Sequence, residues 1–150
     1  MAYGKQAHTG KYTPKNPQKY VGNIHNIVYR SSLERLFMIW CDSNSQVLLW
    51  NSESMVIKYV SPLDEKPHRY FVDFLIKIKN KEGKEKVYLI EVKPMQFTKE
   101  PKPGKRQTKH FLAEAAQWQV NQAKWAAAKQ FCKERGWEFM IITEKDLPRV

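Results

Sequence analysis

Three charged residues stand inside two apolar segments of the chain. Asp73 lies within residues 71–74, and Glu91 and Lys93 lie within residues 89–93. Two neighbouring carboxylates, together with water, can hold a hard cation such as Mg²⁺. Such a cation polarises a phosphoryl oxygen and activates water, and a nearby ammonium group can orient that water or stabilise developing charge. These residue types therefore suit metal-assisted hydrolysis of a phosphodiester.

Two strands of a hairpin are the elements that must position these residues. Residues 69–79 and 86–93 each alternate between apolar and polar side chains, and a polar turn separates them. A register that pairs Phe74 with Ile90 also pairs Val72 with Val92, Ile76 with Tyr88, Leu75 with Leu89, and Lys79 with Glu85. The same register predicts Asp73 directly opposite Glu91, with Lys93 on the same face.

An exposed, salt-bridged strand face is the alternative interpretation of these charges. For an isolated Glu-Val-Lys sequence it is the commoner one. The context favours a site, because strongly apolar residues flank Asp73 and Glu91, and a charge among them has to be reconciled with burial. The two like charges repel each other, and a bound cation would relieve that repulsion.

The overall charge indicates a polyanionic partner. The chain has 26 Lys and Arg against 15 Asp and Glu, a formal charge of +11 and a pI near 9.7. Such a field attracts nucleic acid. A merely soluble basic protein is the alternative, but the charge is segregated, since residues 1–30 contain no acid and a second basic stretch runs from Lys99 to Lys109. Nucleic acid is therefore the expected class of partner.

The length of 150 residues suits one domain. We expect residues 1–28 to be a basic N-terminal arm, loose because Pro and Gly interrupt it, and residues 29–150 to be the folded domain. Its expected elements are a helix from Ser31 or Ser32 to residues 42–44, strands at 47–50, 55–60 and 137–142, the hairpin, and a long helix from Thr108 to about Gly136. No apolar run approaches the ~20 residues of a membrane span, so we expect no membrane association.

Asp73 and Glu91-Val92-Lys93 resemble the metal site of the PD-(D/E)xK nuclease superfamily, although Val72 replaces the proline of that pattern. Residues 29–34 and 139–144 look like the transposon-end nuclease branch, and within it the head-completion nucleases of tailed bacteriophages. The resemblance implies an α/β fold with a restriction-endonuclease-like core, in which helices flank a central mixed β-sheet. It also implies a Mg²⁺ cofactor, with Mn²⁺ able to substitute.

The resemblance assigns catalysis to Asp73, Glu91, Lys93 and Glu34. It assigns metal binding to the three acids among them, with Glu34 contributed by the first helix. Glu34 has an alternative role as the third residue of a capping box with Ser31. Gln117 is either a supporting polar residue or an ordinary surface glutamine. Basic residues near the site are expected to contact the DNA backbone: Lys99, Lys102, Lys105, Arg106, Lys109 and Arg69.

These expectations together describe a metal-dependent DNA endonuclease of phage head completion, with possible additional exonuclease activity. It would cleave or trim packaged DNA before head–tail joining, in contact with portal or head-neck proteins. It would act in the host cytoplasm during assembly, and could remain with the virion. The main alternative is a catalytically silent head-closure adaptor; a repair or restriction nuclease is a third reading, weakened by the absence of a recognition domain.

Overall fold

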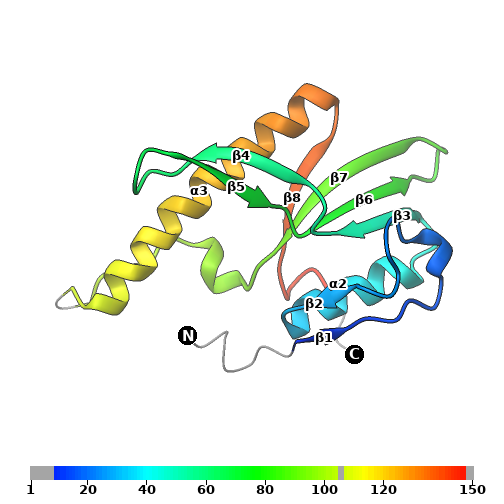
Figure 1. Cartoon of the computed structure of the whole chain (residues 1–150), viewed down its shortest axis with the longest axis horizontal. Coiled ribbons are helices and arrows are strands. Elements are labelled where there is room, and N and C mark those ends of the chain that lie inside the picture. Colours follow the sequence, from blue (N-terminus) through cyan, green and yellow to red (C-terminus); the bar gives the residue numbers. More distant parts are fainter. Residues whose placement is uncertain (1–8, 105–106, 148–150) are drawn as a thin grey trace.

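The computed structural model describes residues 9–104 and 107–147 (Figure 1). A four-stranded mixed sheet in the order β3-β6-β7-β8 forms its centre. β6 is antiparallel to β3 and β7, whereas β8 is parallel to β7, and α3 makes the crossover that a parallel pair requires. The elements are β1 (Gly10–Lys11), η1 (Pro17–Lys19), β2 (Val28–Tyr29), α2 (Ser32–Ser43), β3 (Val47–Ser52), β4 (Val56–Val60), β5 (Pro67–Phe71), β6 (Phe74–Lys79), β7 (Glu85–Val92), η2 (Met95–Thr98), α3 (Lys109–Arg135) and β8 (Glu138–Ile142).

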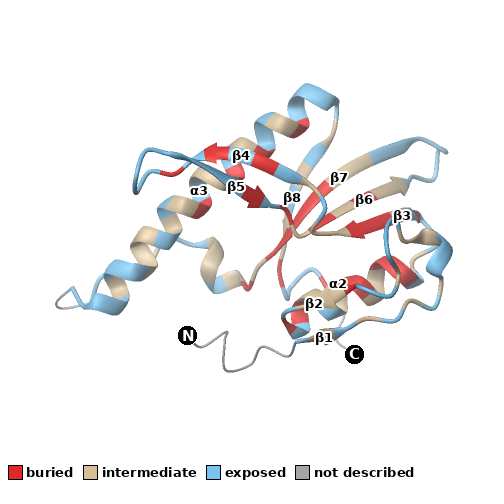
Figure 2. Ribbon diagram, in the orientation of Figure 1, coloured by how far each residue is buried: buried red, intermediate tan, exposed pale blue. Residues whose placement is uncertain are grey.

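Each face of the central sheet has its own hydrophobic core, because side chains alternate along a strand. On one face, Phe37 of α2 packs with Phe74 and Ile90 of the sheet. On the other face, Leu89 packs with Trp125 of α3 and with residues of the β4-β5 hairpin. Figure 2 shows the buried segments of β6 and β7 at the centre of the molecule and the exposed ends of these strands farther out. Helices therefore flank a central mixed sheet, as predicted.

The predicted hairpin register is confirmed from Phe74–Ile90 to Lys79–Glu85. The prediction of one strand over residues 69–79 is wrong, because β5 ends at Phe71 and pairs with β4 in a separate sheet. Between the two strands, the Val72 N–H donates to the Met55 carbonyl. Asp73 therefore lies at a bend just outside the β6-β7 ladder, not inside it opposite Glu91.

The expectation of a loose N-terminal segment is wrong for residues 9–28; residues 1–8 lie outside the described part. β1 pairs with β2, and the buried carboxylate of Asp42 at the end of α2 accepts hydrogen bonds from Tyr12 Oη, Lys15 N–H and Asn16 N–H. The Lys19 ammonium donates to three carbonyls at the same helix end. Proline and glycine indicate irregular backbone, but tertiary contacts fix this segment.

Both helices have the predicted ends. Ser31 caps α2, and Thr108 caps α3 by accepting from the Phe111 N–H at 3.0 Å. α3 ends at Gly136, whose φ of 72° favours glycine. None of the helices in the described ranges is long and apolar enough to cross a membrane.

Candidate active site

Three of the four residues predicted to be catalytic, Asp73, Glu91 and Lys93, lie where β5, β6, β7 and β8 meet. The Asp73 Oδ2 atom accepts from the Val92 N–H at 2.8 Å, which ties the bend to β7. Glu91 is buried on β7, with 7% of its surface exposed. The Lys93 N–H donates to the Ile142 carbonyl at 2.9 Å, just beyond the β7-β8 pairs. Backbone contacts to two neighbouring strands thus position this acidic pair and its lysine.

Both carboxylate oxygens of Glu91 have a partner. Oε1 accepts from the Tyr70 hydroxyl at 2.6 Å, and Oε2 lies 3.6 Å from Lys93 Nζ. Burial raises the pKa of Tyr70 well above its usual 10.0, and the Glu91 charge raises it further. Tyr70 therefore stays a hydroxyl donor at neutral pH and orients the carboxylate.

Asp73 has a strongly unfavourable environment for its charge. Burial raises the pKa of its carboxyl well above 3.8, and the charges of Glu91 and Glu34 raise it further. The Val92 N–H and the Lys93 charge oppose this shift without cancelling it. A divalent cation shared by Asp73 and Glu91 would remove both the repulsion and much of the cost of burial. The residues present therefore fit a bound Mg²⁺.

Glu34 takes part in the cap of α2. Its N–H donates to Ser31 Oγ at 3.1 Å, and its own Oε1 accepts from the Arg30 N–H at 3.3 Å. Burial raises the pKa of Glu34, with contributions from Glu53 and Glu91. Glu34 is thus an electrostatic neighbour of the acidic pair. In the described residues, however, no group of three or more His, Cys, Asp or Glu stands close enough to hold a metal ion.

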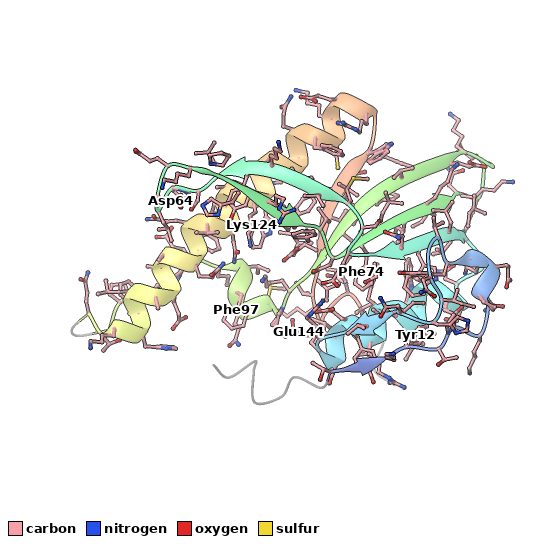
Figure 3. The ribbon with its side chains drawn as sticks, in the orientation of Figure 1. Tyr12, Asp64, Phe74, Phe97, Lys124 and Glu144 are labelled. Atoms are coloured by element: carbon pink, nitrogen blue, oxygen red, sulfur yellow. The ribbon has the colours of Figure 1, made fainter. Side chains whose placement is uncertain are left out.

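Two residues beside the site were missed by the sequence analysis. Unbroken alternation over residues 69–79 would place Tyr70 on the sheet face opposite Asp73, and the break at residues 72–73 turns it toward Glu91. Lys124 of α3 lies with Nζ 5.5 Å from the centre of the Tyr70 ring and interacts electrostatically with the acidic pair (Figure 3). Burial lowers the pKa of Lys124. Its position inside the mainly apolar stripe of α3 was the signal that could have found it.

Gln117 is exposed, and its side chain donates to Asn121 Oδ1 at 2.9 Å, a contact within α3 itself. The expected DNA contacts are spread along the surface. The Arg69 guanidinium lies 5.5 Å from the centre of the Phe71 ring. The side chains of Lys99, Lys102 and Lys109 are exposed, and each forms no ion pair with a described residue. Lys105 and Arg106 lie outside the described residues.

A central mixed sheet flanked by helices, with an acid before one strand and Glu-Val-Lys at the end of the next, defines a nuclease of the PD-(D/E)xK class. A family model described as the TnsA-like endonuclease N-terminal domain matches residues 44–144. The head completion nuclease of Enterobacteria phage T4 is 41% identical over 145 residues, which cover 94% of each chain. The chain therefore belongs to the TnsA-like endonuclease family, and it is a nuclease with DNA as its substrate.

Proposed function

We propose that this nuclease is a Mg²⁺-dependent DNA endonuclease whose metal is held by Asp73 and Glu91. The observation that carries the proposal is the acidic pair formed by the buried Glu91 of β7 and the half-buried Asp73 of the β5-β6 bend, where the pKa of Asp73 is raised and Lys93 is adjacent. Mn²⁺ can replace Mg²⁺, because both accept oxygen ligands. Glu34, an electrostatic neighbour of the pair, would supply a third carboxylate to the metal site.

The protein side of the mechanism follows from the contacts of each residue. When bound, the metal would polarise a phosphoryl oxygen and lower the pKa of a water. The Val92 N–H holds Asp73, and the Tyr70 hydroxyl fixes Oε1 of Glu91. Lys93 lies on the Oε2 side of Glu91, where its ammonium can orient the attacking water and stabilise negative charge on the phosphate.

The name of the T4 relative supports a role in head completion. In this role the enzyme cleaves or trims packaged double-stranded DNA before head–tail joining, with exonuclease activity as a second mode. Its partners are portal or head-neck proteins, and it acts in the host cytoplasm during assembly and remains with the virion. Phosphate contacts by six basic residues hold the duplex: Lys99, Lys102, Lys105, Arg106, Lys109 and Arg69.

Conservative variants test the metal site. Asp73→Asn and Glu91→Gln keep acceptors for Val92 N–H and Tyr70 but remove the charges, so each is expected to lower Mg²⁺-dependent cleavage of duplex DNA at least 1000-fold and to leave DNA binding intact. The matched control is Glu82→Gln at the exposed hairpin turn, which should cleave like the wild type. EDTA should abolish cleavage by the wild type. Retained cleavage in both site variants would refute the assignment.

A silent head-closure adaptor is the competing function. The lack of a preformed three-residue metal cluster in the described part of the chain favours it, whereas the presence of Asp73, Glu91 and Lys93 argues against it, because a degenerate site loses such groups. Calorimetric titration with Mg²⁺ separates the two. Saturable binding that Asp73→Asn removes supports the nuclease, and no binding together with no cleavage supports the adaptor.

A further inference from the structure

Lys124 is a second cation beside the acidic pair, and it comes from a different layer of the fold. It lies on α3 between buried residues, with its ammonium over the faces of two tyrosines of the β4-β5 hairpin. The distances from Nζ to the ring centres are 5.9 Å for Tyr59 and 5.5 Å for Tyr70. Figure 3 shows Lys124 between α3 and β5, toward the middle of the molecule.

The two lysines near the site have different partners. The ammonium of Lys93 is within ion-pair distance of Glu91, at 3.6 Å. Lys124 forms no ion pair with any carboxylate in the described ranges; it interacts with Asp73 and Glu91 only over a longer distance. Holding a half-buried ammonium without a close anion is costly. The two aromatic faces offset part of that cost, and the ammonium remains able to bind an anion.

Tyr70 joins this cation to the acidic pair through one rigid side chain. Its hydroxyl donates to Glu91 at 2.6 Å, while its ring lies under Lys124. The ring therefore fixes the spacing between the carboxylate and the ammonium. A strand of DNA that places one phosphate at Asp73 and Glu91 presents its neighbouring phosphates on either side, and a lysine binds such a phosphate as a point charge.

We propose that Lys124, seated on Tyr59 and Tyr70, forms a subsite for a DNA phosphate next to the one that is cleaved. The subsite rests on the proposed metal-dependent cleavage and adds to it a substrate contact made by α3. Lys124 binds the substrate backbone there, whereas Lys93 serves the reaction itself. The contact is independent of base sequence, because only the phosphate is recognised.

Binding by a cleavage-deficient protein tests the subsite. In an Asp73→Asn background, Lys124→Met should weaken binding of duplex DNA several-fold and reduce the slope of log affinity against log salt by about 1. Lys124→Arg should restore most of the affinity. Tyr59→Leu should also weaken binding, because one of the two aromatic rings that contact the Lys124 ammonium is lost. The matched control, Lys129→Met on the exposed side of α3, should change the affinity less.

Cleavage kinetics give the second readout. With Asp73 intact, Lys124→Met should raise KM several-fold and leave kcat within about threefold, because the contact is made to bound substrate and transition state alike. Unfolding curves establish that each variant is folded. Unchanged affinity, salt slope and KM in Lys124→Met would overturn the subsite. A wild-type enzyme that fails to cleave DNA would refute the proposed function. The binding experiment would still test the phosphate subsite independently of that result.

Discussion

At the scale of single residues, the hydroxyl of Tyr70 is the group that orients Glu91. Tyr70→Phe keeps the ring but removes the 2.6 Å hydrogen bond. Loss of such a supporting partner lowers metal affinity or activity by about tenfold to 100-fold, and we expect this loss in Mg²⁺ titrations and in kcat. Tyr88→Phe, which removes a hydroxyl from the opposite sheet face, is the matched control. Equal activity of both variants would contradict an orienting role.

The charge of Asp73 gives a pH-dependent prediction. Its folded-state pKa is raised above the usual 3.8, so the metal-free protein loses stability as pH rises from about 4 through the raised pKa. Asp73→Asn removes this half-buried charge. We expect the variant to have a higher Tm than the wild type at pH 7 to 8 without metal, and no advantage below pH 4. Mg²⁺ should stabilise the wild type and leave the variant unchanged.

Asp64→Asn is the control for this pH series. Two hydrogen bonds lower the pKa of Asp64, the larger effect coming from the Lys66 N–H and the smaller from His68. This shift is opposite in direction to that of Asp73. Removing its charge should give no gain in Tm at high pH. The interpretation fails if Asp73→Asn is less stable than the wild type across pH 4 to 8.

The site residues that could be predicted from the sequence and those that could not differ in what determines their positions. Asp73, Glu91 and Lys93 could be grouped because alternation and one short turn, both local features, set the hairpin register. Tyr70 and Lys124 could not, because their positions depend on the strand break and on how α3 packs across the sheet. A single sequence gives little indication of such long-range contacts. Here the only indication was a lysine within an apolar stripe.

At the scale of elements, Asp42 attaches the N-terminal segment to α2. Asp42→Ala leaves the amides of Lys15 and Asn16 without their acceptor, and we expect a loss of about 3 kcal/mol in unfolding free energy. Trypsin should then cut at Lys15 or Lys19 in the otherwise native protein. Ser43→Ala, at the adjacent exposed position, should behave as the wild type. Wild-type stability and protection in Asp42→Ala would show that the segment is held by other contacts.

The elements themselves were mostly predictable, and the exceptions share one cause. α2, α3 and β8 follow from caps and apolar periodicity, which are local. The break between β5 and β6 arises because residues 67–71 pair with β4. In the sequence, apolar and polar residues alternate almost unchanged across this break, so the pattern does not indicate it. The contacts of residues 9–28 were hidden for the same reason, since their acceptor, Asp42, lies far along the chain.

At the scale of the whole molecule, the net charge of +11 should make DNA binding strongly dependent on salt. Replacing the exposed lysines 99, 102 and 109 together with Gln should reduce the slope of log affinity against log salt by about 2 to 3 if each contacts a phosphate. Fluorescence anisotropy over a salt series measures this slope. The control is the pair Lys81→Gln and Lys84→Gln at the hairpin turn, which should change the slope less.

The parallel pairing of β7 with β8 has a consequence for synthesis of the protein. The strand that carries Glu91 gains its second neighbour only after α3 and residues 138–142 have been made. On the ribosome, β7 therefore emerges as an open sheet edge, which is prone to pair with other chains. The nascent enzyme stays vulnerable to aggregation, and without the support that Ile142 gives to Lys93, until β8 leaves the exit tunnel.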